Sequence, residues 1–361
     1  MAIAPLTVRL AHTASLVTLE PGPPVARRER EEVEDQLLVK GATRSMGAGE
    51  RARPEVPDDL RTCFERDRDR ILHSPAFRRL AGKTQVFIFP EDHQRTRLTH
   101  ALEVAQVATA VARATRLNVA LTEAIALGHD CGHGPGGHAS EEALSPYVPQ
   151  GYDHAVWGAD VVLVPLNLCA QTLDGIRNHS WSRPSPSTPE AEVVSWADRI
   201  AYVCHDFEDA VRAGIVTTAM LPPQVMQVCG PQRSTQLDVF INGLIDVILR
   251  TGQVAMPEEL AGALDAFRDC DYSHIYLRPA SVAQGRAVVD ILRALVDHLA
   301  DRPGLIAGGP TMERRPTAGS EEAVRTAVTY VGGMTDRYAC RMALARLDWD
   351  RDRLPGGMGN Y

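Results

Sequence analysis

Residues 98–113 read LTHALEVAQVATAVAR, a stretch with the periodicity of a helix. His100, Val104, Val107 and Val111 recur at the spacing that places side chains on one face of an α-helix. We therefore expect a helix here that packs its valines into a core. The same face carries a histidine, which makes this helix a candidate support for a functional site.

The helical pattern continues along most of the chain, so the fold class is predicted to be mainly α. Strand-like alternation is rare, and 85–89 is its best candidate. Ser320 is expected to cap a last helix that extends to residue 347. The other predicted helices are 121–128, 159–173, 189–213, 239–250, 257–268 and 282–301.

Composition divides the chain into three parts. Residues 1–57 contain PGPP, the charge run RREREEVED and no sustained helical period, which predicts a weakly structured leader. Residues 58–215 hold the candidate functional residues and are predicted to form the core domain. Residues 216–361 are predicted to be a helical C-terminal region that packs on this core.

Charge and composition exclude several classes of protein. The 361 residues include 38 Lys and Arg against 46 Asp and Glu, a formal net charge of −8, which disfavours a generic or sequence-specific nucleic-acid binder. No apolar run reaches the ~18 residues that a membrane span requires. The N-terminus lacks a signal-peptide pattern. Seven scattered cysteines without a CxxC pair predict reduced thiols, and we expect a cytoplasmic protein.

Histidines and carboxylates at four positions could form one metal site, and they are His100, His129, Asp130 and Asp198. Two imidazoles and two carboxylates suit Mn²⁺, Fe²⁺, Zn²⁺ or Mg²⁺ and do not suit Cu(I). A single histidine in an apolar helix is more often a core residue. The His-Asp dipeptide alone is not diagnostic either, since it recurs at His205-Asp206. The prediction of a metal site rests on the ordered set.

Longer motifs extend this set, and they are RDRDRILHSPAFRRLAGKTQVF at 66–87, RTRLTH at 95–100, HDCGHGPGGHASE at 129–141, WADRIAY at 196–202 and GMTDRYA at 333–339. In this order they resemble the deoxyguanosine triphosphate triphosphohydrolase (dNTPase) family of HD-domain, metal-dependent phosphohydrolases. The resemblance covers residues 58–347, most of the chain. It implies an HD-domain helical fold with a helical C-terminal extension.

The resemblance also implies an activity, the hydrolysis of deoxynucleoside triphosphates to deoxynucleoside and inorganic triphosphate. His100, His129, Asp130 and Asp198 would hold a divalent ion, with Mn²⁺ or Mg²⁺ favoured. His133, His138 and Glu141 would then lie beside the scissile phosphorus as catalytic residues. The three-residue spacing of His138 and Glu141 suits a histidine that a carboxylate orients.

Substrate-binding residues are predicted from position and charge. His154 matches a family position that often carries a polar substrate-site residue, although a solvent-facing loop histidine is the alternative. Residues 61–100 hold nine Arg and Lys against five acids, which marks a polyphosphate-facing segment. Arg97 is its best candidate, with a surface ion pair to Glu91 or Asp92 as the alternative. The further candidates are Arg79, Lys83 and Tyr202, the last one turn after Asp198.

Two other functions remain open from the sequence. One is a different HD phosphohydrolase activity, such as a 5′-nucleotidase or a signalling-nucleotide hydrolase. The other is a nucleotide-binding regulator without turnover. The resemblance further implies a homo-oligomer, and it admits an allosteric nucleotide at subunit contacts.

Overall fold

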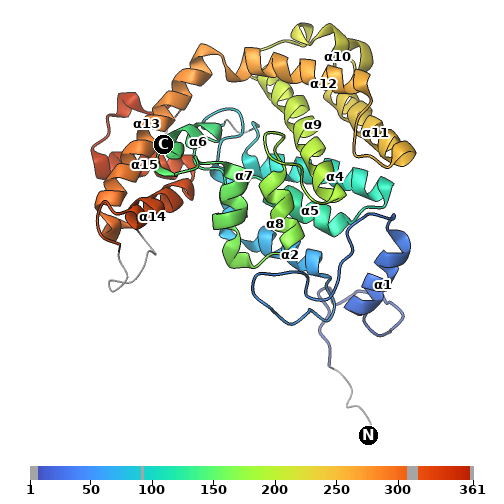
Figure 1. The fold of residues 1–361 in the computed structure, drawn as a ribbon. Coiled ribbons are helices and arrows are strands. Elements are labelled where there is room, and N and C mark those ends of the chain that lie inside the picture. The colour runs from blue at the N-terminus through green and yellow to red at the C-terminus, as the bar shows by residue number, and fades with distance from the viewer. Residues whose placement is uncertain (1–6, 91–92, 307–315, 358–361) are drawn as a thin grey trace.

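The computed structural model describes residues 7–90, 93–306 and 316–357, and this part of the chain is built from helices (Figure 1). The prediction of a mainly α fold is confirmed. The α-helices are α1 (Arg27–Leu37), α2 (Cys63–His73), α3 (Pro75–Arg79), α4 (Arg97–Thr115), α5 (Val119–Gly128), α6 (His138–Leu144), α7 (His154–Trp157), α8 (Ala170–Asn178), α9 (Pro189–Arg212), α10 (Pro223–Val228), α11 (Arg233–Thr251), α12 (Glu258–Asp271), α13 (Pro279–Asp301), α14 (Glu321–Gly332) and α15 (Asp336–Leu347).

Extended pairing within these residues is limited to two isolated bridges, Arg51 with Cys169 and Thr84 with Thr96. The segment 85–89 is therefore a series of bends and not the strand for which it was the best candidate. None of the described helices combines the length and the apolar character that crossing a lipid bilayer requires.

The first core surrounds α4, which packs against α5, α9 and α11. Val104, Val107 and Val111 are fully buried on one face of α4, as the spacing predicted. Burying such a side chain stabilises the fold by about 1.5–3 kcal/mol relative to exposing it. The histidine on the same face is thereby fixed to a helix that the core holds rigid.

A second core is formed by buried side chains of α6, α13, α14 and α15. The long helix α13 runs from the part of the molecule that holds α12 to the part that holds α14 (Figure 1). Leu292, Leu295 and Leu299 recur along its buried face. The region 216–361 is helical, but it contributes to both cores, because α11 and α12 pack on α9 in the first.

Two predicted helices are interrupted in the structure. The segment 159–173 contains a π-helical turn, a 3-10 turn with Pro165 and a left-handed Asn167, and α8 begins only at Ala170. Proline lacks the amide hydrogen that a continuing helix needs. The segment 320–347 divides into α14 and α15 because Thr335 caps a new helix by accepting a hydrogen bond from the Tyr338 amide.

Part of the predicted leader is ordered. Residues 7–26 contain no helix, but α1 follows them, and Arg51 lies beside the first core with a side chain that is 1% exposed. Its guanidinium forms an ion pair of 2.6 Å with Asp67 and donates to the Cys63 carbonyl. The expectation of a weakly structured segment is therefore wrong for residues 27–57. Ala42 is also buried in the first core, and Leu38 and Val39 pack against it. Composition missed this packing because these few apolar residues form no sustained period and polar contacts hold the rest.

Candidate metal centre

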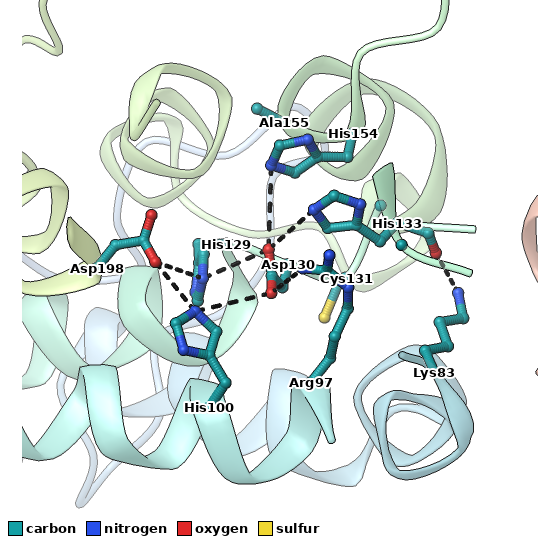
Figure 2. A network of polar contacts seen from close by, with 12 residues as sticks. Lys83, Arg97, His100, His129, Asp130, Cys131, His133, His154, Ala155 and Asp198 are labelled. Atoms are coloured by element: carbon teal, nitrogen blue, oxygen red, sulfur yellow. Dashed lines mark hydrogen bonds and ion pairs between the residues drawn. The ribbon is translucent and has the colours of Figure 1, made fainter. Parts of the chain in front are cut away.

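The four predicted ligands converge between three helices (Figure 2). His100 projects from α4, His129 and Asp130 follow α5, and Asp198 projects from α9. His100 Nε2 lies 3.0 Å from Asp198 Oδ1 and 4.0 Å from Asp130 Oδ2. His129 Nε2 lies 3.5 Å from Asp130 Oδ1 and 3.7 Å from Asp198 Oδ1. Donor atoms bound to one ion at about 2.1 Å are separated by similar distances, so this set fits a divalent metal.

His129 is oriented for metal binding by the end of its helix. Its Nδ1 lies 2.7 Å from the Ala126 carbonyl oxygen, one of the acceptors that a helix C-terminus leaves without an intrahelical donor. A carbonyl only accepts, so Nδ1 carries the hydrogen and Nε2 presents a lone pair. That Nε2 is buried and has no hydrogen-bond partner among the described residues. An unpaired buried nitrogen of this kind is what an absent ligand would explain.

Arg97 gives the centre a fixed positive charge. It lies on α4, is 2% exposed, and donates from Nη1 to Asp130 Oδ2 at 2.6 Å. Burial would raise the pKa of the Asp130 carboxyl, but the Arg97 charge, with the neighbouring histidines, holds that pKa well below its usual value. Arg97 Nε and Nη2 have no partner among the described residues. Glu91 and Asp92, its alternative partners, lie outside the described residues.

The glycine-rich loop after Asp130 is held by a residue far away in the sequence. The amide of Gly136, whose φ is +72°, donates to Asp336 Oδ1 at 2.8 Å. Asp336 Oδ2 accepts from the amide and the hydroxyl of Thr84. Gly132 allows a close approach, since a Cβ there would lie 1.9 Å from the His154 carbonyl oxygen. The motif 333–339 thus positions the loop through Asp336.

The predicted catalytic residues are brought together, but with a different pairing. Glu141 Oε1 accepts from Nδ1 and from the amide of His154, at 2.7 and 3.0 Å, so it orients His154 rather than His138. His133 stacks on His154 with ring centroids 3.7 Å apart, and its Nε2 lies 3.2 Å from Asp130 Oδ1. His154 is buried, so the solvent-facing alternative for this residue is wrong.

His138 lies at the open side of this group. Its ring centroid is 5.1 Å from that of His133, and the residue is exposed at the start of α6. The dense surroundings on its other side still lower the pKa of its imidazole to about 4, mainly by desolvation and then through the Arg97 charge. His138 is therefore neutral at physiological pH and accessible to a ligand.

Two of the predicted phosphate-binding cations make other contacts in the structure. Lys83 is buried, and its ammonium donates to the carbonyls of His133 and Gly332, which corrects its prediction as a substrate ligand. Burial, followed by the Arg79 charge, lowers the pKa of this ammonium to about 7. Arg79 lines a separate pocket with α14 and α15. Tyr202 is half-buried one turn after Asp198, and burial, opposed by the Arg199 charge and reinforced by that of Asp198, raises the pKa of its hydroxyl.

Much of the basic charge in 61–100 is neutralised by nearby acids. The pairs are Arg61 with Asp58 and Asp69, Arg66 and Arg70 with Glu55, Arg68 with Asp69 and Glu123, and Arg95 with Glu103, Glu208 and Asp209. Most of the basic residues that are in excess in this segment therefore form ion pairs within the fold. Of the named substrate-binding cations, Arg97 is the one that reaches the centre.

The second His-Asp dipeptide is separate from the centre. His205 Nδ1 lies 3.1 Å from Glu103 Oε2, and Asp206 Oδ2 accepts from the Tyr276 hydroxyl at 2.6 Å. Neither belongs to a group of potential ligands in the described part of the chain. Asp206 Oδ1 is buried without a partner there, and burial raises the pKa of the carboxyl from 3.8 to about 7.

Asp206→Asn is expected to become more stable relative to the parent protein as the pH rises. The folded parent keeps a proton on Asp206 between pH 3.8 and about 7, whereas the unfolded chain has lost it. The contribution of Asp206 to the parent's free energy of unfolding therefore falls as the pH rises across this interval, by at most about 1.4 kcal/mol per pH unit. Above the interval this contribution is constant. Urea unfolding of both proteins at pH 5 and pH 8 measures the change, and an equal difference at both values would contradict it.

Sequence reasoning missed His179. This residue follows α8, is 2% exposed, and its ring centroid lies 4.9 Å from that of His129. It forms one group of potential ligands with His129 and Asp198. Like His129, it directly follows a helix. The predicted helix 159–173 ended too early to place His179 at such a position.

Comparison with known proteins places the centre in a recognised domain. Residues 97–203 match the HD domain, and residues 254–344 match the phosphohydrolase-associated domain. A deoxyguanosinetriphosphate triphosphohydrolase-like protein from Caldanaerobacter subterraneus is 40% identical over 320 residues, covering 87% of this chain and 93% of its own. One of the same name from Clostridium perfringens is 37% identical, covering 85% and 92%.

A solved structure supports the fold. The crystal structure of a phosphohydrolase from Bacteroides thetaiotaomicron matches with a TM-score of 0.51 at 17% identity, covering 80% of this chain and 72% of its own.

Proposed function

The chain belongs to the family of deoxyguanosinetriphosphate triphosphohydrolase-like proteins and is a metal-dependent HD-domain hydrolase, and on that premise we propose that it converts deoxynucleoside triphosphates to deoxynucleoside and inorganic triphosphate. The observation that carries the proposal is the buried ligand cluster beside a guanidinium, that of Arg97, two of whose nitrogens have no partner among the described residues. His100, His129, Asp130 and Asp198 would hold the ion, for which we propose Mn²⁺ or Mg²⁺.

A bound divalent ion would supply an activated water and neutralise phosphoryl charge. Arg97 Nε and Nη2 have no hydrogen-bond partner among the described residues, and a guanidinium can bind two phosphate oxygens at once, so we propose that these two groups donate to the phosphate chain. The loop that carries His133 is held by hydrogen bonds to Asp336 and Lys83. These contacts support binding of the phosphate chain beside Asp130.

His138 is our candidate for the proton donor to the leaving oxygen. Its imidazole is neutral in the free protein, because its pKa lies at about 4. The negative charge of an entering triphosphate favours the protonated form and raises that pKa. His138 can therefore take a proton as substrate binds and release it to the leaving oxygen. Glu141 supports the reaction indirectly, since it orients the His154 ring.

We expect His138→Ala to keep its metal content and to lose at least ~10²-fold in kcat, the usual size of an acid–base contribution. Steady-state kinetics and metal analysis of the same preparation provide the measurement. His73→Ala changes an exposed histidine of α2 and is the matched control, with kinetics like those of the parent. An unchanged kcat in His138→Ala would exclude this residue as the donor.

Chromatography of the products from a panel of deoxynucleotides with Mn²⁺ tests the function. The proposal requires inorganic triphosphate and deoxynucleoside in equal amounts from at least one deoxynucleoside triphosphate. Phosphate released only from monophosphates would indicate a 5′-nucleotidase. Binding without any product would indicate a regulatory nucleotide-binding protein.

We also propose a cytoplasmic homo-oligomer that a second nucleotide regulates. A pocket of about 830 Å³ between α3, α14 and α15 supports the second nucleotide site alone, because Arg79, Arg325 and Arg341 line it against a single acid, Glu322. Thr335 also lines it and directly precedes Asp336, which holds the Gly136 loop. The same panel, run with pairs of nucleotides, tests the regulation by a second nucleotide. Light scattering tests the oligomeric state.

A further inference from the structure

We propose that Cys63 and Cys169 form a thiol pair that a hydroperoxide oxidises to a disulfide, which then links α2 to α8. Both are free thiols in the structure, and the two residues are buried, with 1% and 0% of their surface exposed. Neither belongs to a group of potential metal ligands in the described part of the chain. The two cysteines are far apart in the sequence, so spacing alone does not reveal the pair.

The two sulfur atoms meet beneath a turn of the N-terminal segment. Gly49 packs directly on them, since a Cβ placed on this residue would collide with Cys169 Sγ and lie 3.3 Å from Cys63 Sγ. The Cys169 thiol also donates a hydrogen bond to the Cys63 sulfur. A disulfide tolerates little change in the separation of its two backbones, so sulfur atoms that are already in contact are the most easily joined.

The Arg51–Asp67 ion pair holds the backbones of both cysteines. Arg51 Nη2 donates to the Cys63 carbonyl at 2.9 Å, and Asp67 Oδ2 accepts from the Cys169 amide at 2.8 Å. Arg51 also forms an isolated bridge with Cys169. Both partners of the ion pair are buried, so water competes little for these contacts. The two backbones are thus kept together by groups other than the sulfur atoms.

Cys63 is the more reactive member of the pair. It is the first residue of α2, where the free N–H groups of a helix N-terminus favour a thiolate. The hydrogen bond from Cys169 lowers the pKa of Cys63, and the Met46 amide adds to this effect against the opposing influence of burial. The same hydrogen bond, reinforced by burial, raises the pKa of Cys169. Cys63 therefore supplies the nucleophilic thiolate, and Cys169 remains a thiol beside it.

The oxidation proceeds in two steps with hydrogen peroxide as the oxidant. The Cys63 thiolate attacks one peroxide oxygen, the O–O bond breaks, and hydroxide leaves as Cys63 becomes a sulfenic acid. The Cys169 sulfur then attacks the Cys63 sulfur, the S–O bond breaks, and the departing oxygen takes the thiol proton to leave as water. The two sulfurs lose two electrons in total. The peroxide is reduced to two molecules of water, because the hydroxide takes up the proton that Cys63 released.

The turn over the sulfur atoms controls access to the pair. Met46, in the same turn as Gly49, is 76% exposed, so this cover lies at the surface, where local opening costs less than unfolding of the core. Peroxide then reaches Cys63 without loss of the fold. The disulfide closes the long loop between residues 63 and 169, and such a cross-link restricts the unfolded chain. We therefore expect the oxidised protein to melt at a higher temperature than the reduced one.

The test is treatment of the full chain with hydrogen peroxide, followed by denaturation, titration of free thiols and mass spectrometry of its peptides. We expect two of the seven thiols to be lost and one linked peptide pair to contain Cys63 and Cys169. The melting temperature should rise by several degrees, and dithiothreitol should reverse all three changes. Cys340→Ser changes a buried cysteine of α15 and is the matched control, which should lose the same two thiols.

Cys63→Ser and Cys169→Ser each remove one partner, so neither should form the linked peptides or melt at a higher temperature after peroxide treatment. Circular dichroism checks the helices of each variant. The thiol count and the linked peptides of the parent require no variant, so they decide the question even if a variant misfolds. A treated parent that keeps all seven thiols, or that carries only sulfinic acid at Cys63, would overturn the proposal, as would a disulfide that joins other cysteines.

Discussion

Asp130→Ala is expected to lose its bound metal and its turnover together while keeping its helices. Asp130 Oδ1 and Oδ2 face His129 and His100, so the substitution removes the carboxylate that both ligands share. It also leaves Arg97 buried without its counter-ion, and breaking a buried pair in this way costs about 3–5 kcal/mol of stability. Metal analysis, circular dichroism and a triphosphatase assay on one preparation give the three readouts.

Asp130→Asn separates the two effects, since the amide keeps the shape and removes the charge. We expect it to be folded, to lose its metal, and to have no measurable rate. His205→Ala is the control for loss of a buried histidine and should retain metal and rate. Full metal content with a normal rate in either Asp130 variant would refute the assignment of this centre.

The four proposed ligands could be predicted because their signal is distributed over long segments. His100 lies on a periodic helix, and His129-Asp130 lies between an apolar helix and a glycine-rich loop. The structure brings these residues together with Asp198, although they come from separate helices. The apolar residues whose spacing predicted α4, α5 and α9 are also the residues that these helices bury in one core.

The residues that were missed or misplaced depend on contacts that no periodicity reports. Arg51 is buried by an ion pair with Asp67, so a polar segment packs where composition predicts little structure. His179 was missed because the predicted helix ended at 173, whereas α8 begins only at Ala170 and continues to Asn178. The prediction for Lys83 was wrong because the sequence reveals the positive charge of a lysine but not its hydrogen-bond acceptors, which here are two backbone carbonyls.

Arg97→Ala is expected to lower kcat/KM for triphosphates by about 10²–10⁴-fold, since it would remove two hydrogen bonds to a charged group, each of which contributes about 1.5–3 kcal/mol. The residue is 2% exposed, so a surface ion pair does not describe it. Nη1 donates to Asp130, while Nε and Nη2 have no partner in the described part of the chain and are the groups that we propose for the phosphate chain. Loss of the guanidinium also lets the Asp130 pKa rise toward its usual value, which weakens metal binding at low pH.

Arg97→Lys distinguishes these two roles. A lysine restores the positive charge beside Asp130, so metal content should recover, but a single ammonium cannot donate in the planar geometry that binds two phosphate oxygens. We expect kcat/KM to recover only in part. Arg113→Ala, near the other end of α4, is the matched control, because its guanidinium donates to Thr109 and lies far along the helix from the centre. If Arg97→Ala and Arg113→Ala have the same kinetics, Arg97 serves the fold alone and the phosphate chain must be bound by other groups.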